Sequence, residues 1–246
     1  MGKNGKLSKP LFTQYPRGAA LVYLIIAIPL ASLISLFLPG TFSPMVTAAF
    51  TFPVFFYFTR RELYRDTFLM IVFGGILQFA IVALLTTFYK DIVTQWTVDF
   101  GEIAMFGGIR IEWDNSVLTM VSKAVGLLFT AVMALISGGA LILFSGVAVI
   151  NSVAINMGGL ITDGSGWTVA FMSVTPWELS SFIGHGLVSI GVASLFYIKI
   201  EKRGNNFNGL VEPLTLGIIF VLLDIYLELE MGEAWRSAQM AALSLR

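Results

Sequence analysis

The sequence predicts an all-α fold: a polytopic membrane helix bundle that forms a single transmembrane domain over residues 1–246. Of these residues 57% are hydrophobic and only 12% are charged, and the mean hydropathy is +0.84. Soluble domains are about 45–50% apolar, so a soluble chain of this length could not hide so much apolar surface. Apolar runs of about 20 residues, the length that crosses a bilayer, recur along the chain. We therefore predict about six to seven transmembrane helices.

The first candidate span covers residues 18–38 and follows a basic tail, residues 1–17, that contains no acidic residue. The span ends in FLPG, without the small-residue cleavage site of a secretory signal, so we predict a retained helix. The second and third candidates are residues 41–59 and 67–89. The last two are residues 167–198 and 210–229.

One long apolar run, residues 117–157, is too long for a single span. We expect it to divide near 137–139 or near 145–146, where serine precedes glycine. Its many small and amide residues allow two interpretations. A broken or re-entrant segment near 137–160 is tolerated only against protein or a water-filled cavity. Tight helix packing, with Asn151 and Asn156 as interhelical hydrogen-bonding groups, is the interpretation that we favour.

The charged residues between the spans predict the orientation of the chain. Basic residues gather in the tail, in TRRELYR (59–65) and in KIEKRG (199–204), whereas loop 90–116 carries two basic and five acidic residues. Basic loops stay on the cytoplasmic side, and seven spans place all three basic segments there. We therefore predict a multi-pass protein of the cell membrane with a cytoplasmic N-terminus and an extracytoplasmic loop over residues 90–116.

That loop is the largest segment outside the predicted spans. Weak alternation and two glycines at 107–108 predict a small β-hairpin or an interfacial flap. Trp96 and Trp113, near its two ends, fit the aromatic belt of a membrane interface. The loop is too short for an enzymatic domain, so function must lie in the membrane part or with partners.

The segment TPWELSSFIGHGLVSIG, residues 175–191, contains the only histidine, His185. Glu178, Ser181, His185 and Ser189 fall on one stripe of a helix. Because ionisable side chains are costly within a membrane, this stripe is a candidate polar site. The structural alternative makes Thr175 an N-cap and Glu178 its partner in a capping box. We favour the capping box for Glu178 and leave both interpretations open for His185.

Two further charged clusters admit a functional and a structural interpretation. Arg60, Arg61 and Arg65 would dock a cytoplasmic partner such as an ATPase, although the positive-inside rule alone explains a basic turn. Asp224 and Glu228, four residues apart, begin an acidic cluster that Glu230 and Glu233 continue. Such carboxylates bind divalent cations, but they more often mark the solvated end of a helix, which is the interpretation that we favour.

Several classes of site are excluded by the residues present. The chain has no cysteine and a single histidine, which excludes disulfides, thiol nucleophiles, Cys/His zinc sites and bis-histidine haem ligation within it. Phosphate-binding GxxxxGK, GxSxG and HExxH motifs do not occur. We therefore expect a non-enzymatic protein with no cofactor, no metal site and no nucleic-acid partner.

Residues of about 120–200 resemble the stage II sporulation protein M family, polytopic membrane proteins of bacteria and archaea. The matching parts are MALISGGALILFSG, VINSVAINMGG, the turn TDGSGW and the helix SVTPWELSSFIGHGLVSIG, in that order. Family members tend to have Pro, His and Glu at the start of this helix. Pro176 and Glu178 stand in register, but Trp177 occupies the place of the histidine. The resemblance implies a non-enzymatic membrane component that works with partners, which in spore formers are cell-wall hydrolases.

Two functional hypotheses follow. The leading one is a non-catalytic membrane subunit, either a scaffold or the permease component of an ATP-driven (ABC) transporter. It would assemble with other membrane subunits or with a second copy, and residues 138–156 and 178–189 would line the path. The alternative is a stand-alone, proton-linked secondary transporter that uses Glu178 and His185, since imidazole changes charge near neutral pH. The chain shows no inverted repeat, which argues against this alternative.

Overall fold

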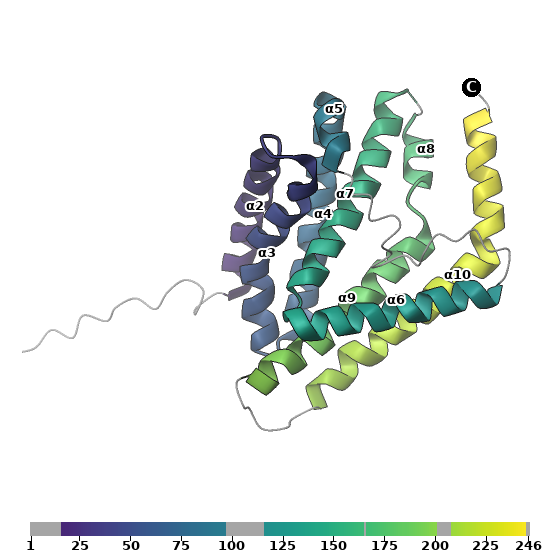
Figure 1. Ribbon diagram of the computed structural model, residues 1–246. Helices are drawn as coiled ribbons and strands as arrows, with labels where there is room; N and C mark the ends of the chain where they lie inside the picture. The colour runs from purple at the N-terminus through teal and green to yellow at the C-terminus, as the bar shows by residue number, and fades with distance from the viewer. Residues whose placement is uncertain (1–15, 97–115, 165, 201–207, 245–246) are drawn as a thin grey trace, which may run out of the picture.

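The computed structural model describes residues 16–96, 116–164, 166–200 and 208–244, and these residues form helices and short turns without a strand (Figure 1). The all-α prediction is confirmed for this part of the chain. The helices in order are α2 (Pro16–Ser35), η1 (Gly40–Phe42), α3 (Ser43–Arg60), α4 (Tyr64–Phe88), α5 (Lys90–Val93), η2 (Thr94–Trp96), α6 (Ser116–Ser137), α7 (Ala140–Thr162), α8 (Gly166–Met172), α9 (Pro176–Ile200) and α10 (Asn208–Ser244).

The long helices pack as two groups. Helices α2, α3, α4 and α7 form a four-helix group, and α6, α9 and α10 form a three-helix group. Figure 1 shows the four-helix group running nearly upright, whereas the three-helix group crosses the view at a slant. Helix α9 lies at the junction because it also contacts α3, α4 and α7.

Six of the described helices are long and apolar enough to cross a membrane, which agrees with the predicted six to seven spans. They are α2, α4, most of α6, α7, α9 and most of α10. Helix α3, predicted as a span over 41–59, does form, but it is shorter than α4 and contains Pro44 and Pro53. It packs against α2, α4 and α7 and completes the four-helix group.

The long apolar run divides at the first of the two predicted points. Gly138 and Gly139 have φ values of 58° and 92°, in the left-handed region that glycine adopts without a steric penalty. A side chain at Gly139 would overlap the ring of Phe55, so the turn also requires glycine for space. Beyond it α7 continues from Ala140 to Thr162 as one helix, so the re-entrant alternative is wrong.

Two other predicted spans differ in their bounds. The predicted span 167–198 contains two helices, the short α8 and then α9, which begins at Pro176 because proline is favoured at the first helical position. Helix α10 continues to Ser244 rather than ending at 229, because its last turns are rich in helix-forming residues. Figure 1 shows α10 changing direction before its C-terminal part.

The loop predicted over 90–116 begins as two short helical turns, α5 and η2. Trp96 is fully buried among residues that include Val82, Val93 and Ile155, so its assignment to the aromatic belt is wrong. The expected hairpin or flap, Trp113 and the N-terminal tail through residue 15 lie outside the described residues.

Charged side chains tie the helices together at the two ends of the bundle. Arg17 Nε lies 2.8 Å from Asp66 Oδ1, and Arg65 forms an ion pair of 2.8 Å with Glu212. These contacts join the starts of α2, α4 and α10 at one end, which we call the basic end. At the opposite end Lys90 Nζ lies 2.6 Å from Asp163 Oδ1. The described basic segments therefore share one end; that this end is cytoplasmic stays a prediction.

Candidate functional site

A buried ion-pair cluster joins α6 to α10. Lys123 Nζ lies 2.9 Å and 2.8 Å from the two carboxylate oxygens of Asp224 and 3.0 Å from Glu228 Oε2. The contact with Glu228 is an ion pair that lacks hydrogen-bond geometry. The side chains of Lys123 and Asp224 are 7% and 0% exposed, and that of Glu228 is 34% exposed. An ammonium group is thus held between two carboxylates inside the helix bundle.

Helix α9 extends this cluster with Ser181 and His185. The Ser181 hydroxyl is a hydrogen-bond partner of the Asp224 carboxylate. His185 Nδ1 lies 2.8 Å from the Ser181 carbonyl oxygen and 3.3 Å from its hydroxyl, and the ring is almost fully buried. We call Lys123, Ser181, His185, Asp224 and Glu228 the charge network; it joins all three helices of the three-helix group.

A close crossing of α9 and α10 fixes the positions of Ser181 and Asp224. A methyl group added at Gly184 would lie 2.9 Å from the Gly217 carbonyl oxygen, and one added at Gly217 would lie equally close to that of Gly184. The Ser180 hydroxyl donates to the Phe220 carbonyl at 2.8 Å. Glycines let two backbones approach closely in lipid, and here they bring the polar faces of both helices into contact.

Two tryptophans connect α9 with α10 and α8. Trp177 and Trp235 pack edge-to-face with ring centroids 6.1 Å apart, and Trp235 Nε1 donates to the Met172 carbonyl at 3.0 Å. At 1.5 Å per residue, His185 lies about 12 Å along α9 from Trp177, and Asp224 lies about 16 Å along α10 from Trp235. Both residues therefore lie well within the candidate membrane spans of α9 and α10.

The formal charges within the network do not balance. Lys123 supplies one positive charge, whereas Asp224 and Glu228 supply two negative charges, and neutral His185 adds none. An unbalanced charge is expensive in a membrane interior. One proton, on a carboxylate or on the imidazole, would neutralise the network.

The structure separates Glu178 from His185. The Thr175 backbone N–H donates to Glu178 Oε2 at 3.2 Å, and the Glu178 N–H donates to the Thr175 hydroxyl at 3.3 Å. This reciprocal pair is the capping box that the sequence suggests. His185 lies about 10 Å further along the helix. The charged neighbour that acts on its ring is Lys123. Ser189, on the same stripe, donates to the His185 carbonyl at 2.6 Å.

A second polar cluster, without charge, lies in the four-helix group. Gln78 Nε2 donates to Asn151 Oδ1 at 2.8 Å, and the Ser32 hydroxyl donates to Gln78 Oε1 at 3.4 Å. All three side chains are buried and together they join α2, α4 and α7. Asn156, which we expected to serve like Asn151, is exposed on the surface of α7.

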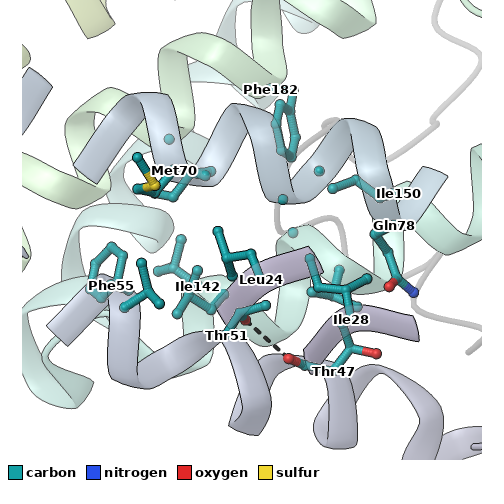
Figure 2. A pocket seen from close by; sticks show the side chains of 18 of the residues that line it. Leu24, Ile28, Thr47, Thr51, Phe55, Met70, Gln78, Ile142, Ile150 and Phe182 are labelled. Atoms are coloured by element: carbon teal, nitrogen blue, oxygen red, sulfur yellow. Dashed lines mark hydrogen bonds between the residues drawn. The ribbon is translucent and has the colours of Figure 1, made fainter. Parts of the chain in front are cut away.

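A partly open cavity of about 70 Å³ lies where α9 meets the four-helix group (Figure 2). Of the described residues that line it, most are apolar and none is charged. Its polar lining residues are Thr47, Thr51, Gln78 and Ser189. Helix α9 contributes Ser189, from the stripe that carries Ser181 and His185, and Phe182 and Gly186, from the face next to it.

The three arginines predicted to dock a partner lie together at the basic end. Arg60 Cζ lies 5.6 Å from the centroid of the Phe56 ring, and Arg61 Cζ lies 4.4 Å from that of Tyr57. Arg65 pairs with Glu212, although its side chain is 83% exposed. Each arginine therefore has a partner within the chain.

Sequence reasoning missed Lys123 and Gln78. Lys123 is the only charged residue between positions 117 and 157, and that isolation was a usable signal. The spacing of Asp224 and Glu228 was noticed, but it was assigned to a solvated helix end. That assignment is wrong for Asp224, which is fully buried. Among the described residues no group of three His, Cys, Asp or Glu side chains is arranged to hold a metal ion.

Comparison with protein-family models, with curated proteins and with solved structures found no match. The six apolar helices make this chain a multi-pass membrane protein by length and composition. Its more specific function has to be argued from the site.

Proposed function

We propose that this chain is a proton-linked membrane transport protein and that the charge network is its proton-binding site. The observation that carries the proposal is a buried lysine shared by two carboxylates within candidate membrane spans, with a histidine beside them. Intramembrane ionisable groups of this kind commonly mark ion pathways and proton relays.

The imbalance of charge favours a working site over a structural one. A buried ion pair adds little stability compared with apolar packing, so a purely structural contact has no need of a third charge. With Glu228 ionised, Lys123 is held against α10 by two carboxylates. When a proton neutralises one of them, that attraction weakens and α6 becomes free to move relative to α10. Proton binding is thereby linked to the packing of the three-helix group.

The proposed site uses other acidic residues than the proton-linked transporter expected from the sequence, which used Glu178 and His185. The Glu178 carboxylate is engaged in the helix cap, so the acidic partners are Asp224 and Glu228. His185 keeps its place through Ser181, which contacts both the imidazole and Asp224. Movement of a proton between the carboxylates and the imidazole would therefore pass by the Ser181 hydroxyl.

The proposal is tested with spin labels, because the chain contains no cysteine that would react with them unintentionally. One cysteine introduced at Val125 on α6 and one at Leu222 on α10, both exposed, would carry the two labels. We expect the distance between them, measured by double electron–electron resonance in liposomes, to change with pH. Glu228→Gln should abolish the change, whereas Glu178→Gln, the matched control in the cap, should preserve it.

Transport itself is tested in liposomes that contain a pH-sensitive dye. A membrane potential should drive proton entry in the presence of a transported solute, and Asp224→Asn should remove this entry. A distance that does not respond to pH, together with proton entry equal to that of empty liposomes, would refute the proposal.

A second candidate function is a membrane subunit that binds a cytoplasmic partner. The observation in its favour is the group of Arg60, Arg61 and Arg65 at the basic end, where the Arg65 side chain is largely exposed. The resemblance to the stage II sporulation protein M family also favours a partner-dependent role. Purification from native membranes in mild detergent should then yield an ATPase or a second membrane chain in fixed ratio. Recovery of the chain alone would contradict this candidate.

A further inference from the structure

We propose that the cavity between α9 and the four-helix group binds a small uncharged solute with an aliphatic body and one hydrogen-bonding group. This inference rests on the proposed function, because it names the class of solute whose movement the proton would drive. It is carried by the lining of the cavity, by an unpartnered hydroxyl and by the position of α9.

The lining of the cavity disfavours a charged solute. Side chains such as Leu24, Ile142 and Ile150 form most of the wall, and no ionisable side chain of the described residues lines it. Moving an ion into such a space without a partner is strongly unfavourable. An aliphatic body, in contrast, replaces empty volume with dispersion contacts on every side.

Polar atoms at the cavity provide for one hydrogen-bonding group. Thr47 lines the cavity and is 1% exposed, and its hydroxyl has no hydrogen-bond partner among the described residues. A buried hydroxyl without a partner costs free energy, which a bound acceptor or donor would recover. Gln78 also lines the cavity, and Figure 2 shows its amide at one side of the space. A hydroxyl or carbonyl group on the solute would match this polar side.

The volume limits the size of the solute. About 70 Å³ is roughly half of the ~150 Å³ cavity that holds benzene. The space therefore encloses a short aliphatic body, on the order of four non-hydrogen atoms, and is too small to enclose a sugar.

Helix α9 links the cavity to the charge network. Phe182 and Gly186 line the cavity, and each follows directly after a network residue, Ser181 or His185. A solute bound beside Phe182 contacts the same helical turn whose Ser181 bonds to Asp224. Solute binding and proton binding thus act on one helix.

The experiment uses 3-azibutanol, a photoreactive short alcohol, on the full chain in liposomes. After illumination, mass spectrometry should find the label on lining residues such as Phe182 and Ile150, and 1-butanol should compete with it. Gly146→Leu should weaken labelling by about tenfold or more, because the added side chain fills the cavity beside Phe182. Gly159→Leu is the matched control on the same helix, since nothing lies within 4 Å of its added carbon. This control should be labelled like the unmodified chain.

A second arm with a photoreactive fatty acid separates a free solute from a lipid chain. Labelling of the cavity by the fatty acid, without competition by 1-butanol, would overturn the proposal in favour of a lipid site. Cavity labelling that is absent, or that persists in Gly146→Leu, would also overturn it. Photolabelling by 3-azibutanol could be saturable while the spin-label distance between α6 and α10 does not change with pH. That combination would support the cavity site and refute only the proton-linked function.

Discussion

The two helix groups solve the problem of polar side chains in a membrane in different ways. The four-helix group buries neutral amides and a hydroxyl, with Gln78 bonded to Asn151 and Ser32. The three-helix group buries formal charges, with Lys123 between Asp224 and Glu228. Neutral hydrogen bonds hold helices together at a small cost in free energy. Burying a charge in the membrane costs much more, so a buried charge is a candidate functional group. Under the proposed function the three-helix group binds the proton, and the four-helix group provides the scaffold and most of the cavity wall.

Removing the lysine should give the largest effect. Lys123→Met leaves the buried Asp224 and the partly exposed Glu228 carboxylates without a cation and should lower the free energy of unfolding by about 3–5 kcal/mol. Denaturation in a graded series of detergent mixtures, followed by circular dichroism, measures the change. The double variant Lys123→Met with Asp224→Asn should recover part of the loss, because one stranded charge is gone. Equal stability of the single and double variants would contradict the charge network.

The second-largest effect should come from separating α9 from α10. Gly184→Ala places a methyl group against the Gly217 carbonyl and should cost about 1–3 kcal/mol, as overpacking does elsewhere. Two residues along the same helix, Gly186 has nothing within 4 Å of an added carbon, so Gly186→Ala is the matched control. The same denaturation measurement should show a loss for the first variant only. Equal losses would mean that helix propensity, not the close crossing, is responsible.

The neutral cluster should respond more weakly than the charged one. Asn151→Ala removes the acceptor of the Gln78 amide and should cost about 1 kcal/mol, a typical value for one hydrogen bond. In this variant the spin-label distance between α6 and α10 should change with pH as it does in the unmodified chain. A loss of the pH response in Asn151→Ala would mean that the proton-linked change is not confined to the three-helix group.

The helix cap should give the smallest effect. Glu178→Gln keeps a side chain that can accept the Thr175 N–H, so the free energy of unfolding should fall by less than about 0.5 kcal/mol. Thr175→Ala, which removes the reciprocal acceptor, should cost about 1 kcal/mol. If Glu178→Gln instead cost as much as Lys123→Met, Glu178 would belong to the functional site after all.

Local features of this fold could be predicted from the sequence, because they depend on neighbouring residues. The spans, the turn at Gly138 and Gly139 and the cap formed by Thr175 and Glu178 each follow from a pattern within a few positions. The end of α10 was misjudged because apolar character fades before helix propensity does. Burial of Trp96 depends on contacts with α4 and α7, which no local pattern shows.

The candidate site could be predicted only in part, because its contacts span the chain. Lys123 and Asp224 are 101 positions apart, so their pairing depends on the tertiary arrangement of α6 and α10. His185 was found by its isolation in an apolar helix, and the same reasoning applied to Lys123 would have found the network. The partner assigned to His185, Glu178, was chosen because it lies on the same stripe. The hydrogen-bond partner of His185 is Ser181 on its own helix, and its charged neighbour, Lys123, comes from α6.

Infrared difference spectroscopy tests the central claim most directly, since a protonated carboxyl group has a carbonyl band that a carboxylate lacks. Spectra of the reconstituted chain would be compared between about pH 5 and pH 8, the range that proton-linked sites use. We predict a carboxyl band that appears at the lower pH, remains in Glu178→Gln and disappears when Asp224→Asn and Glu228→Gln are combined. A spectrum in which that double variant keeps the band, or in which the unmodified chain never shows it, would contradict a proton-binding charge network.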